Sequence, residues 1–276
     1  MSLHLPVVHV CNLRCVFCSA AGREDRSTLT AMLRSIDEEQ SGHVQISGGE
    51  PFLMDPSELL RLLARCRKRR LEVELQTNGV AVPSCDAERF RMIAGLVSFF
   101  NVNFPAHDRE LDYALTRTEG AFEARLAGVR RMLGAGAAVR LTHVVCRPNL
   151  AHCAEFVEFV RRELRGVSWI QFSYVKGAGL ARGREDLVPR YAEAAGPLEA
   201  ALDRAAGLGI PFDVDHIPPC FLGKYSDRHV DCRKMLSGEG GAHLEEKRHV
   251  PRCEGCRLRP RCPGPRKDYL DLYEDL

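Results

Sequence analysis

Strand-like runs alternate with segments of helical periodicity over roughly the first 209 residues of the chain. The strand-like runs are Leu5–Val10, His43–Ser47, Leu71–Gln76, Val97–Asn103, Val139–Val145 and Trp169–Val175. The helical segments include one that begins at Asp55, and Glu119–Leu133, Leu150–Leu164 and Pro189–Ala206. Strands that alternate with helices form parallel sheets with right-handed crossovers. Because six units are too few for a closed eight-fold barrel, we expect an α/β fold, a partial (β/α)6 TIM-like barrel.

The composition and periodicity of the sequence change after Gly209. The run Ile210–Ile217 could add one more strand, but from Pro218 onward periodicity fades. Prolines, glycines, histidines and five of the twelve cysteines dominate this tail. We therefore predict two regions, a core domain of residues 1–209 and a small metal-organised extension of residues 210–276.

Charge and hydropathy exclude several classes of protein. Lys+Arg 39 against Asp+Glu 37 leaves a net charge of +2, which gives no electrostatic reason to expect nucleic acid or an anionic membrane. The chain has no apolar run of about 18 residues, and its first ten residues lack the features of a secretory signal. We expect a cytoplasmic protein. In that reducing compartment, twelve cysteines point to metal or cluster ligation rather than disulfides.

Three cysteines, Cys11, Cys15 and Cys18, directly follow the first predicted strand. Soft thiolates within one loop select an iron–sulfur cluster or zinc. No fourth cysteine lies nearby in the sequence, so a cluster held here would keep one position open for a substrate. A zinc-binding loop on an α/β scaffold is the alternative.

The spacing Cys-x3-Cys-x2-Cys resembles the signature of the radical S-adenosylmethionine (SAM) superfamily. Ser47–Gly48–Gly49–Glu50–Pro51, after the second strand, looks like the GGE motif of that family, and Thr77–Asn78–Gly79 ends the third strand as in many relatives. The resemblance implies that Cys11, Cys15 and Cys18 bind three irons of a [4Fe–4S] cluster. It also implies that SAM binds the fourth iron and is cleaved reductively to a 5′-deoxyadenosyl radical.

The same resemblance suggests which residues contact SAM. Gly48 and Gly49 lack a Cβ atom, so their backbone can approach the methionyl ammonium group closely. Glu50 would brace that turn or bind the ammonium group, and Phe17 matches a position that packs near adenine. Asn103, at the end of the fourth strand, is our candidate for the SAM ribose or carboxylate; a simple amide cap of the strand end is the alternative.

A second group of cysteines has the spacing Cys-x2-Cys-x5-Cys and consists of Cys253, Cys256 and Cys262. A two-residue gap lets two sulfurs reach one centre through a tight turn. The fourth ligand must come from elsewhere, with Cys220 as the best candidate and Cys232 as the second.

This tail resembles the auxiliary-cluster extensions of radical SAM enzymes, SPASM and its shorter twitch form. The longer form continues with a cysteine at the position of Arg266, and no cysteine follows Cys262. We therefore expect one auxiliary [4Fe–4S] cluster, with a structural zinc site as the alternative. Cys232, if it is not a ligand, is a weak candidate for a catalytic hydrogen-atom donor, as in some peptide epimerases of this superfamily.

Relatives with such extensions commonly modify peptides, so the resemblance implies a peptide or protein substrate. A small metabolite is the alternative within the enzyme class, and a non-catalytic metal-binding or electron-transfer protein is the alternative outside it. The resemblance also implies a reductant such as flavodoxin or ferredoxin. Because the chain enters its first strand at about Leu5, we expect any leader peptide to be held by a separate protein.

Overall fold

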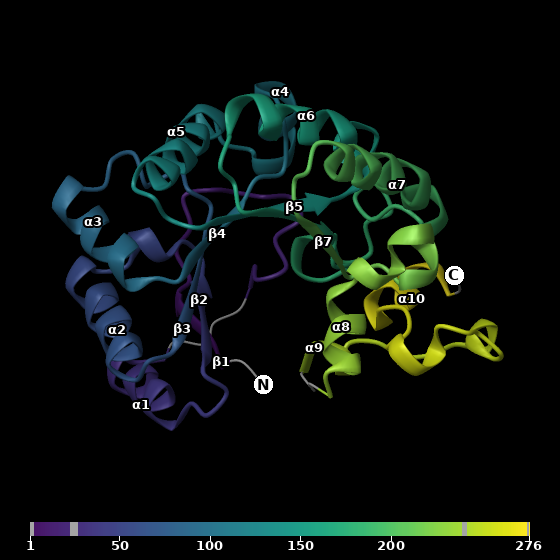
Figure 1. Ribbon diagram of the computed structural model, residues 1–276, viewed down its shortest axis with the longest axis horizontal. Helices are drawn as coiled ribbons and strands as arrows, with labels where there is room; N and C mark the ends of the chain where they lie inside the picture. Colours follow the sequence, from purple (N-terminus) through teal and green to yellow (C-terminus); the bar gives the residue numbers. More distant parts are fainter. Residues whose placement is uncertain (1–2, 23–26, 239–241, 275) are drawn as a thin grey trace.

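The computed structural model describes residues 3–22, 27–238, 242–274 and 276, and its centre is one parallel β-sheet. Seven strands pair in chain order, and β1 and β7 form the two edges (Figure 1). They are β1 (Leu3–Val8), β2 (His43–Gly48), β3 (Glu72–Thr77), β4 (Phe99–Asn103), β5 (Val139–Val145), β6 (Trp169–Tyr174) and β7 (Phe212–Asp215). The sheet curves like a barrel wall but does not close, since β1 and β7 do not pair within the described part of the chain.

Helices cover the outer side of this curved sheet, as Figure 1 shows. Those of the barrel are α1 (Leu29–Glu38), α2 (Pro56–Lys68), α3 (Ala87–Leu96), α4 (Arg109–Thr116), α5 (Ala121–Gly134), α6 (Cys153–Glu163) and α7 (Tyr191–Gly207). Those of the C-terminal extension are α8 (Val230–Leu236), α9 (Ala242–Glu245) and α10 (Lys267–Tyr273).

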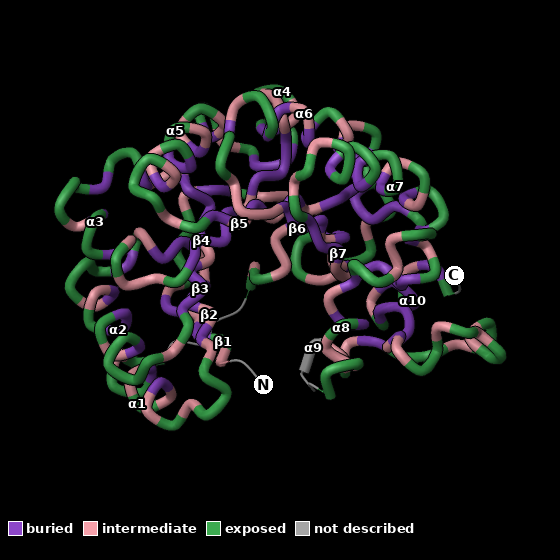
Figure 2. The backbone as a smooth tube through the Cα atoms, in the orientation of Figure 1, coloured by how far each residue is buried: buried purple, intermediate pink, exposed green. Residues whose placement is uncertain are grey.

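The two faces of the sheet differ in chemistry because successive side chains of a strand point to opposite sides. Val73, Leu75 and Phe100 are fully buried in the apolar core under the helices. The alternating residues, such as Glu74 and Asn101, are polar and face the concave side. Figure 2 shows the resulting buried layer along the strands. The sheet therefore encloses a polar interior within an apolar shell.

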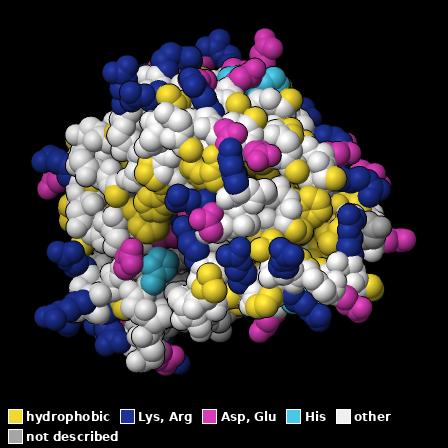
Figure 3. All heavy atoms as spheres, turned by 45° about the vertical axis from the view of Figure 1, so that its right-hand side comes forward, with side chains coloured by type: hydrophobic (Ala, Val, Ile, Leu, Met, Phe, Trp, Pro, Cys, Tyr) yellow, Lys and Arg dark blue, Asp and Glu magenta, His cyan; other side chains and the backbone are white. Residues whose placement is uncertain are grey.

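The outer surface carries charges of both signs. Figure 3 shows Lys and Arg side chains interspersed with Asp and Glu over one face, in keeping with the net charge of +2. Among the described residues, no helix combines the length and the apolar character needed to span a bilayer.

The partial barrel expected from the sequence is confirmed, with adjustments at its two edges. All six predicted strands are present, and β7 joins β6 in parallel as a seventh. The first strand ends at Val8 rather than Val10, because the chain there leaves the sheet and Val10 is 66% exposed. The predicted division at residue 209 falls between α7 and β7, so the sheet itself continues into the C-terminal region.

Aromatic side chains attach the C-terminal extension to the barrel. The rings of Tyr191 on α7 and Tyr269 on α10 stack with centroids 3.6 Å apart. The Tyr191 N–H also donates to Tyr269 Oη (3.2 Å), and Tyr273 Oη donates to the Val188 carbonyl (2.5 Å). All four side chains are buried. Such packing fixes α10 directly against the outer helix layer.

Close backbone contact also fixes α5 against the turn that follows β3. Gly128 lies within α5, and a Cβ atom added there would be 2.2 Å from the Gly79 carbonyl oxygen. A Cβ atom added to Gly134, at the end of the same helix, would have no neighbour within 4 Å. The two glycines of one helix therefore differ in the space around them.

We expect Gly128→Ala to lower the free energy of unfolding by about 1–3 kcal/mol, because backbone must move to admit the methyl group. Gly134→Ala is the matched control and should be neutral or stabilising by up to about 1 kcal/mol, since alanine favours the helix. Denaturant titration of both variants measures the difference. Equal stability of the two would contradict the proposed close contact.

Candidate functional site

The first cysteine group lies in the loop Cys11–Cys18, which is anchored at the carboxyl edge of the sheet. The backbone N–H groups of Arg14 and Val16 donate to carbonyls of the last two residues of α4 (3.0 and 2.9 Å). The N–H of Leu180, after β6, donates to the Cys18 carbonyl (3.0 Å). Bonds from both sides hold the loop across the strand ends.

All three cysteines of this loop are free thiols. Burial, opposed by Arg125 and aided by the neighbouring Cys11 and Cys18 sulfurs, raises the pKa of Cys15 to about 12. Burial also raises the pKa of Cys11. Thiolates so close together require a cation to compensate their charge, so the donor set fits a metal centre.

The glycines of the second motif are required by the chain that leaves β1. The N–H of Gly49 donates to the Val8 carbonyl (2.6 Å), and the N–H of Glu50 donates to the Val10 carbonyl (2.8 Å). Gly48 has φ +130°, and a Cβ atom on Gly49 would lie 2.1 Å from the Val10 oxygen. This close approach is a structural reason for both glycines; their approach to a methionyl ammonium group stays a prediction.

The carboxylate of Glu50 is completely buried and bridges the ends of β2 and β3. It accepts hydrogen bonds from Thr77 Oγ1 (2.6 Å) and from the N–H groups of Phe52 (3.1 Å) and Asn78 (2.7 Å). Burial raises the pKa of Glu50, and these hydrogen bonds oppose the increase. The contacts are those of a brace for the turn, one of the two roles expected for this residue.

Asn78 links the third strand to the cysteine loop. Its Nδ2 donates to Asn12 Oδ1 (2.7 Å) and lies 3.6 Å from Cys11 Sγ. Its Oδ1 accepts from the N–H of Val80 (2.9 Å). The sequence pattern identified Asn78 as part of a turn but assigned it no contact.

Arg125 is a site residue that the sequence pattern did not reveal. It is fully buried on α5, where its guanidinium forms an ion pair with Asp112 and donates from Nε to the Asn78 carbonyl (3.1 Å). Its Nη2 atom is buried and has no hydrogen-bond partner among the described residues. The signal was present, because Arg125 lies on the same helical face as Phe122 and Leu126, where a charge is out of place.

Phe17 and Asn103 complete the residues proposed for the first site. Phe17 is buried in the core, between the second and third cysteines of the loop. Asn103 ends β4, and its Oδ1 atom is buried without a hydrogen-bond partner in the described chain. A buried acceptor of this kind usually has a partner, and the contact of Asn103 with SAM stays a prediction.

The structure brings the second cysteine group together around one cavity in the C-terminal extension. The cavity is lined by the sulfur-bearing residues Cys220, Cys253, Cys256 and Cys262. Cys220 comes from the turn after β7 and is the fourth residue that the sequence favoured. Cys232 is buried on α8 and does not line the cavity. The four lining thiols are free, so the set fits a centre with four protein ligands.

Arg266 occupies the position where the longer extension has a further cysteine. It is buried and forms ion pairs with Glu246 (2.6 Å) and Asp268 (2.7 Å). Arg266 is therefore held in a charged network with residues on both sides of it in the extension.

Comparison with known sequences identifies relatives of the chain. Residues 5–160 match the radical SAM superfamily. The chain is 30% identical to a PqqA peptide cyclase of Gluconobacter oxydans, over 99% of this chain and 75% of that protein. It is 28% identical to a probable GTP 3′,8-cyclase of Saccharolobus islandicus, over 65% of this chain and 58% of that protein.

Among solved structures, the chain resembles native anSMEcpe with bound AdoMet and Kp18Cys peptide. The TM-score is 0.72 at 14% identity, and the match covers the whole of this chain and 91% of that one. At this identity the likeness concerns the fold, and it supports the partial-barrel assignment.

We expect Cys15→Ala to lower the iron content of the anaerobically reconstituted protein by about four per chain, since one [4Fe–4S] cluster loses a ligand. Cys66→Ala is the control, because Cys66 is a buried free thiol on α2 and belongs to neither cysteine group. Iron and sulfide counting measures the effect. An equal loss of iron in both variants, or none in either, would contradict the assignment.

Proposed function

The chain belongs to the radical SAM superfamily and is an enzyme of that family, and we propose that it acts on a peptide. The family implies a [4Fe–4S] cluster and SAM. One observation carries the proposal. Three free thiols, Cys11, Cys15 and Cys18, lie in a loop whose first part is hydrogen-bonded to the Gly49–Glu50 turn at one edge of the sheet. A cluster held by these three cysteines would supply the electron that cleaves SAM to methionine and a 5′-deoxyadenosyl radical, and that radical would abstract a hydrogen atom from the substrate.

Two unsatisfied buried atoms match the polar groups of SAM. Arg125 Nη2 is a cationic donor and fits the methionyl carboxylate. Asn103 Oδ1 is an acceptor, which a ribose hydroxyl satisfies and a carboxylate does not. Of the two groups expected to meet Asn103, we therefore favour the ribose. Phe17 would lie against the adenine.

The concave face of the sheet is the place for the substrate. Glu74 accepts hydrogen bonds from Asn101 (2.7 Å) and Gln76 (2.8 Å) and pairs with Arg140, while Thr142 donates to Asn101 (2.6 Å). This network, from three neighbouring strands, makes the interior polar, which suits a peptide backbone better than an apolar lining would. The similarity to a PqqA peptide cyclase supports the same substrate class.

A small metabolite is the second candidate, favoured by the similarity to a probable GTP 3′,8-cyclase. That match covers less of this chain than the match to the peptide cyclase does, so we rank it second.

We further infer that Cys220, Cys253, Cys256 and Cys262 hold an auxiliary [4Fe–4S] cluster rather than zinc. Their gathering around one cavity supports this assignment. The enzyme would receive electrons from flavodoxin or ferredoxin and, for a leader peptide, act with a separate binding protein. A reducing compartment such as the cytoplasm would keep the thiols free.

Anaerobic reconstitution followed by reduction with SAM present tests the proposed function. We expect about eight irons per chain for two four-iron clusters, and 5′-deoxyadenosine that forms only with Cys11, Cys15 and Cys18 intact. Peptide modification is followed by mass spectrometry with candidate precursor peptides, and nucleotides serve as the comparison. About four irons would assign the extension to zinc, and turnover of nucleotides alone would favour the metabolite.

We expect Arg125→Lys to weaken SAM binding about tenfold or more while the iron content is retained. Lysine can still pair with Asp112, but it cannot also supply the second donor for a carboxylate. Arg131→Lys on the same helix is the control, because Arg131 donates to carbonyls of the loop after β3, such as Val82 and Cys85. Equilibrium titration of the cluster-loaded variants with SAM measures both. Unchanged affinity in Arg125→Lys would remove this residue from the SAM site.

A further inference from the structure

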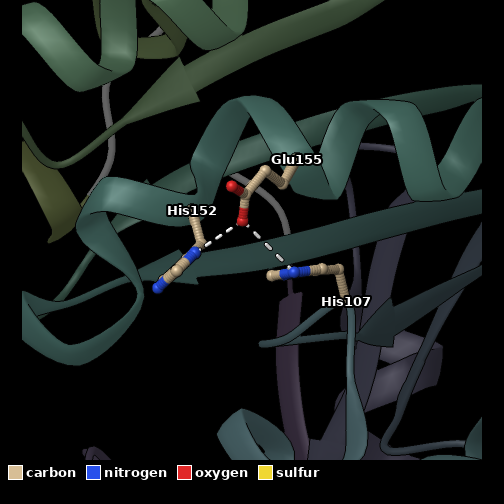
Figure 4. A group of neighbouring side chains, drawn as sticks. All are labelled: His107, His152 and Glu155. Atoms are coloured by element: carbon tan, nitrogen blue, oxygen red, sulfur yellow. Dashed lines mark hydrogen bonds and ion pairs between the residues drawn. The ribbon is translucent and has the colours of Figure 1, made fainter.

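Two histidines and a glutamate meet in the segments that follow β4 and β5. His107 lies in the loop after β4, His152 ends the short 3-10 helix Arg147–His152 after β5, and Glu155 is in the first turn of α6. Figure 4 shows the three side chains converging. Glu155 Oε2 lies 2.6 Å from His152 Nδ1 and 3.3 Å from His107 Nε2. The three donor atoms all lie within 4.8 Å of one another.

These distances are close to those around a tetrahedral metal ion. Zinc bonds of 2.0–2.1 Å to nitrogen and oxygen place neighbouring ligand atoms roughly 3.3–3.4 Å apart. The contact between His107 and Glu155 already has this length. The contact between His152 and Glu155 must open by less than an ångström, and these side chains, 45% and 59% exposed, are free to rotate that far.

The surroundings of His107 direct one ring nitrogen toward the group. Its Nδ1 is buried without a hydrogen-bond partner among the described residues, so Nε2 is the atom that is able to bind a ligand. A second carboxylate, Asp108 Oδ2, also lies 3.3 Å from this Nε2. The other oxygen of Asp108 caps α4 by accepting from the Leu111 N–H (2.9 Å). Two carboxylates thus face the same imidazole nitrogen, which is a favourable environment for a cation.

We propose that His107, His152 and Glu155 bind a divalent transition-metal ion of the zinc class. Two imidazoles and one carboxylate form a recurrent set of zinc ligands, and water or Asp108 would take the fourth position. The ion would join the loop after β4 to α6. That loop begins at Asn103, so the ion would also fix the approach to the predicted SAM ribose contact. The metal site itself does not depend on the proposed reaction.

Zinc binding to the cluster-loaded protein tests the proposal, because occupied cysteines then do not compete for the added metal. We expect one zinc per chain in competition with a chromophoric chelator. The zinc K-edge absorption spectrum should show nitrogen and oxygen neighbours, imidazole outer-shell scattering and no sulfur. The absorption edge is specific to zinc, so the result does not depend on the activity of the iron–sulfur clusters.

Substitution of single ligands locates the ion. Glu155→Gln and His152→Asn should each weaken zinc binding at least tenfold, because each removes one of three protein ligands. Glu158→Gln is the matched control; Glu158 is exposed one turn further along α6 and pairs with Arg204. A thermal shift with zinc in the wild-type protein, absent from Glu155→Gln, gives a second readout. Sulfur ligation, no bound zinc, or wild-type affinity in Glu155→Gln would overturn the proposal. His107, His152 and Glu155 would then form ion pairs only.

Discussion

The position of the cysteine loop depends on one buried carboxylate. A charged group without water is costly unless hydrogen bonds compensate it, and Glu50 receives three, from the chain just after β2 and from the end of β3. Because one donor follows β2 and the other two lie at the end of β3, the carboxylate ties the segments at these two strand ends together. Asn78 extends the same connection to Asn12 and so to the loop that carries the sulfurs. The geometry of the site therefore begins in the sheet rather than in the loop.

A second buried charge connects the helical layer to the same edge. Arg125 contacts the Asn78 carbonyl from α5 and is neutralised by Asp112 from α4, and the last turn of α4 holds the cysteine loop through backbone hydrogen bonds. One nitrogen of this guanidinium has no partner among the described residues. If the methionyl carboxylate of SAM binds there, as proposed, its hydrogen bond would recover the cost of leaving a buried donor unsatisfied.

Local patterns in the sequence predict the fold well, because strand alternation is read within a few residues and all six predicted strands are present. The metal-binding role of the two cysteine groups stays a prediction. The four residues of β7 are too few for a clear period, so the sequence indicates only a possible strand there. The contact of Asn78 with Asn12 joins residues 66 apart, and the unpaired nitrogen of Arg125 depends on how α4 packs. Such features arise only from tertiary structure.

The open edge of the sheet has a consequence for what its interior can accommodate. A closed barrel has a circumference fixed by its strand number and stagger. Here β1 and β7 remain unpaired with each other in the described chain, so no ladder of hydrogen bonds sets the distance between them. Slight changes in twist between neighbouring strands, added over seven strands, can widen or narrow the arc while every existing pairing is kept. The radius of the curved sheet can thus adjust to enclosed molecules of different width.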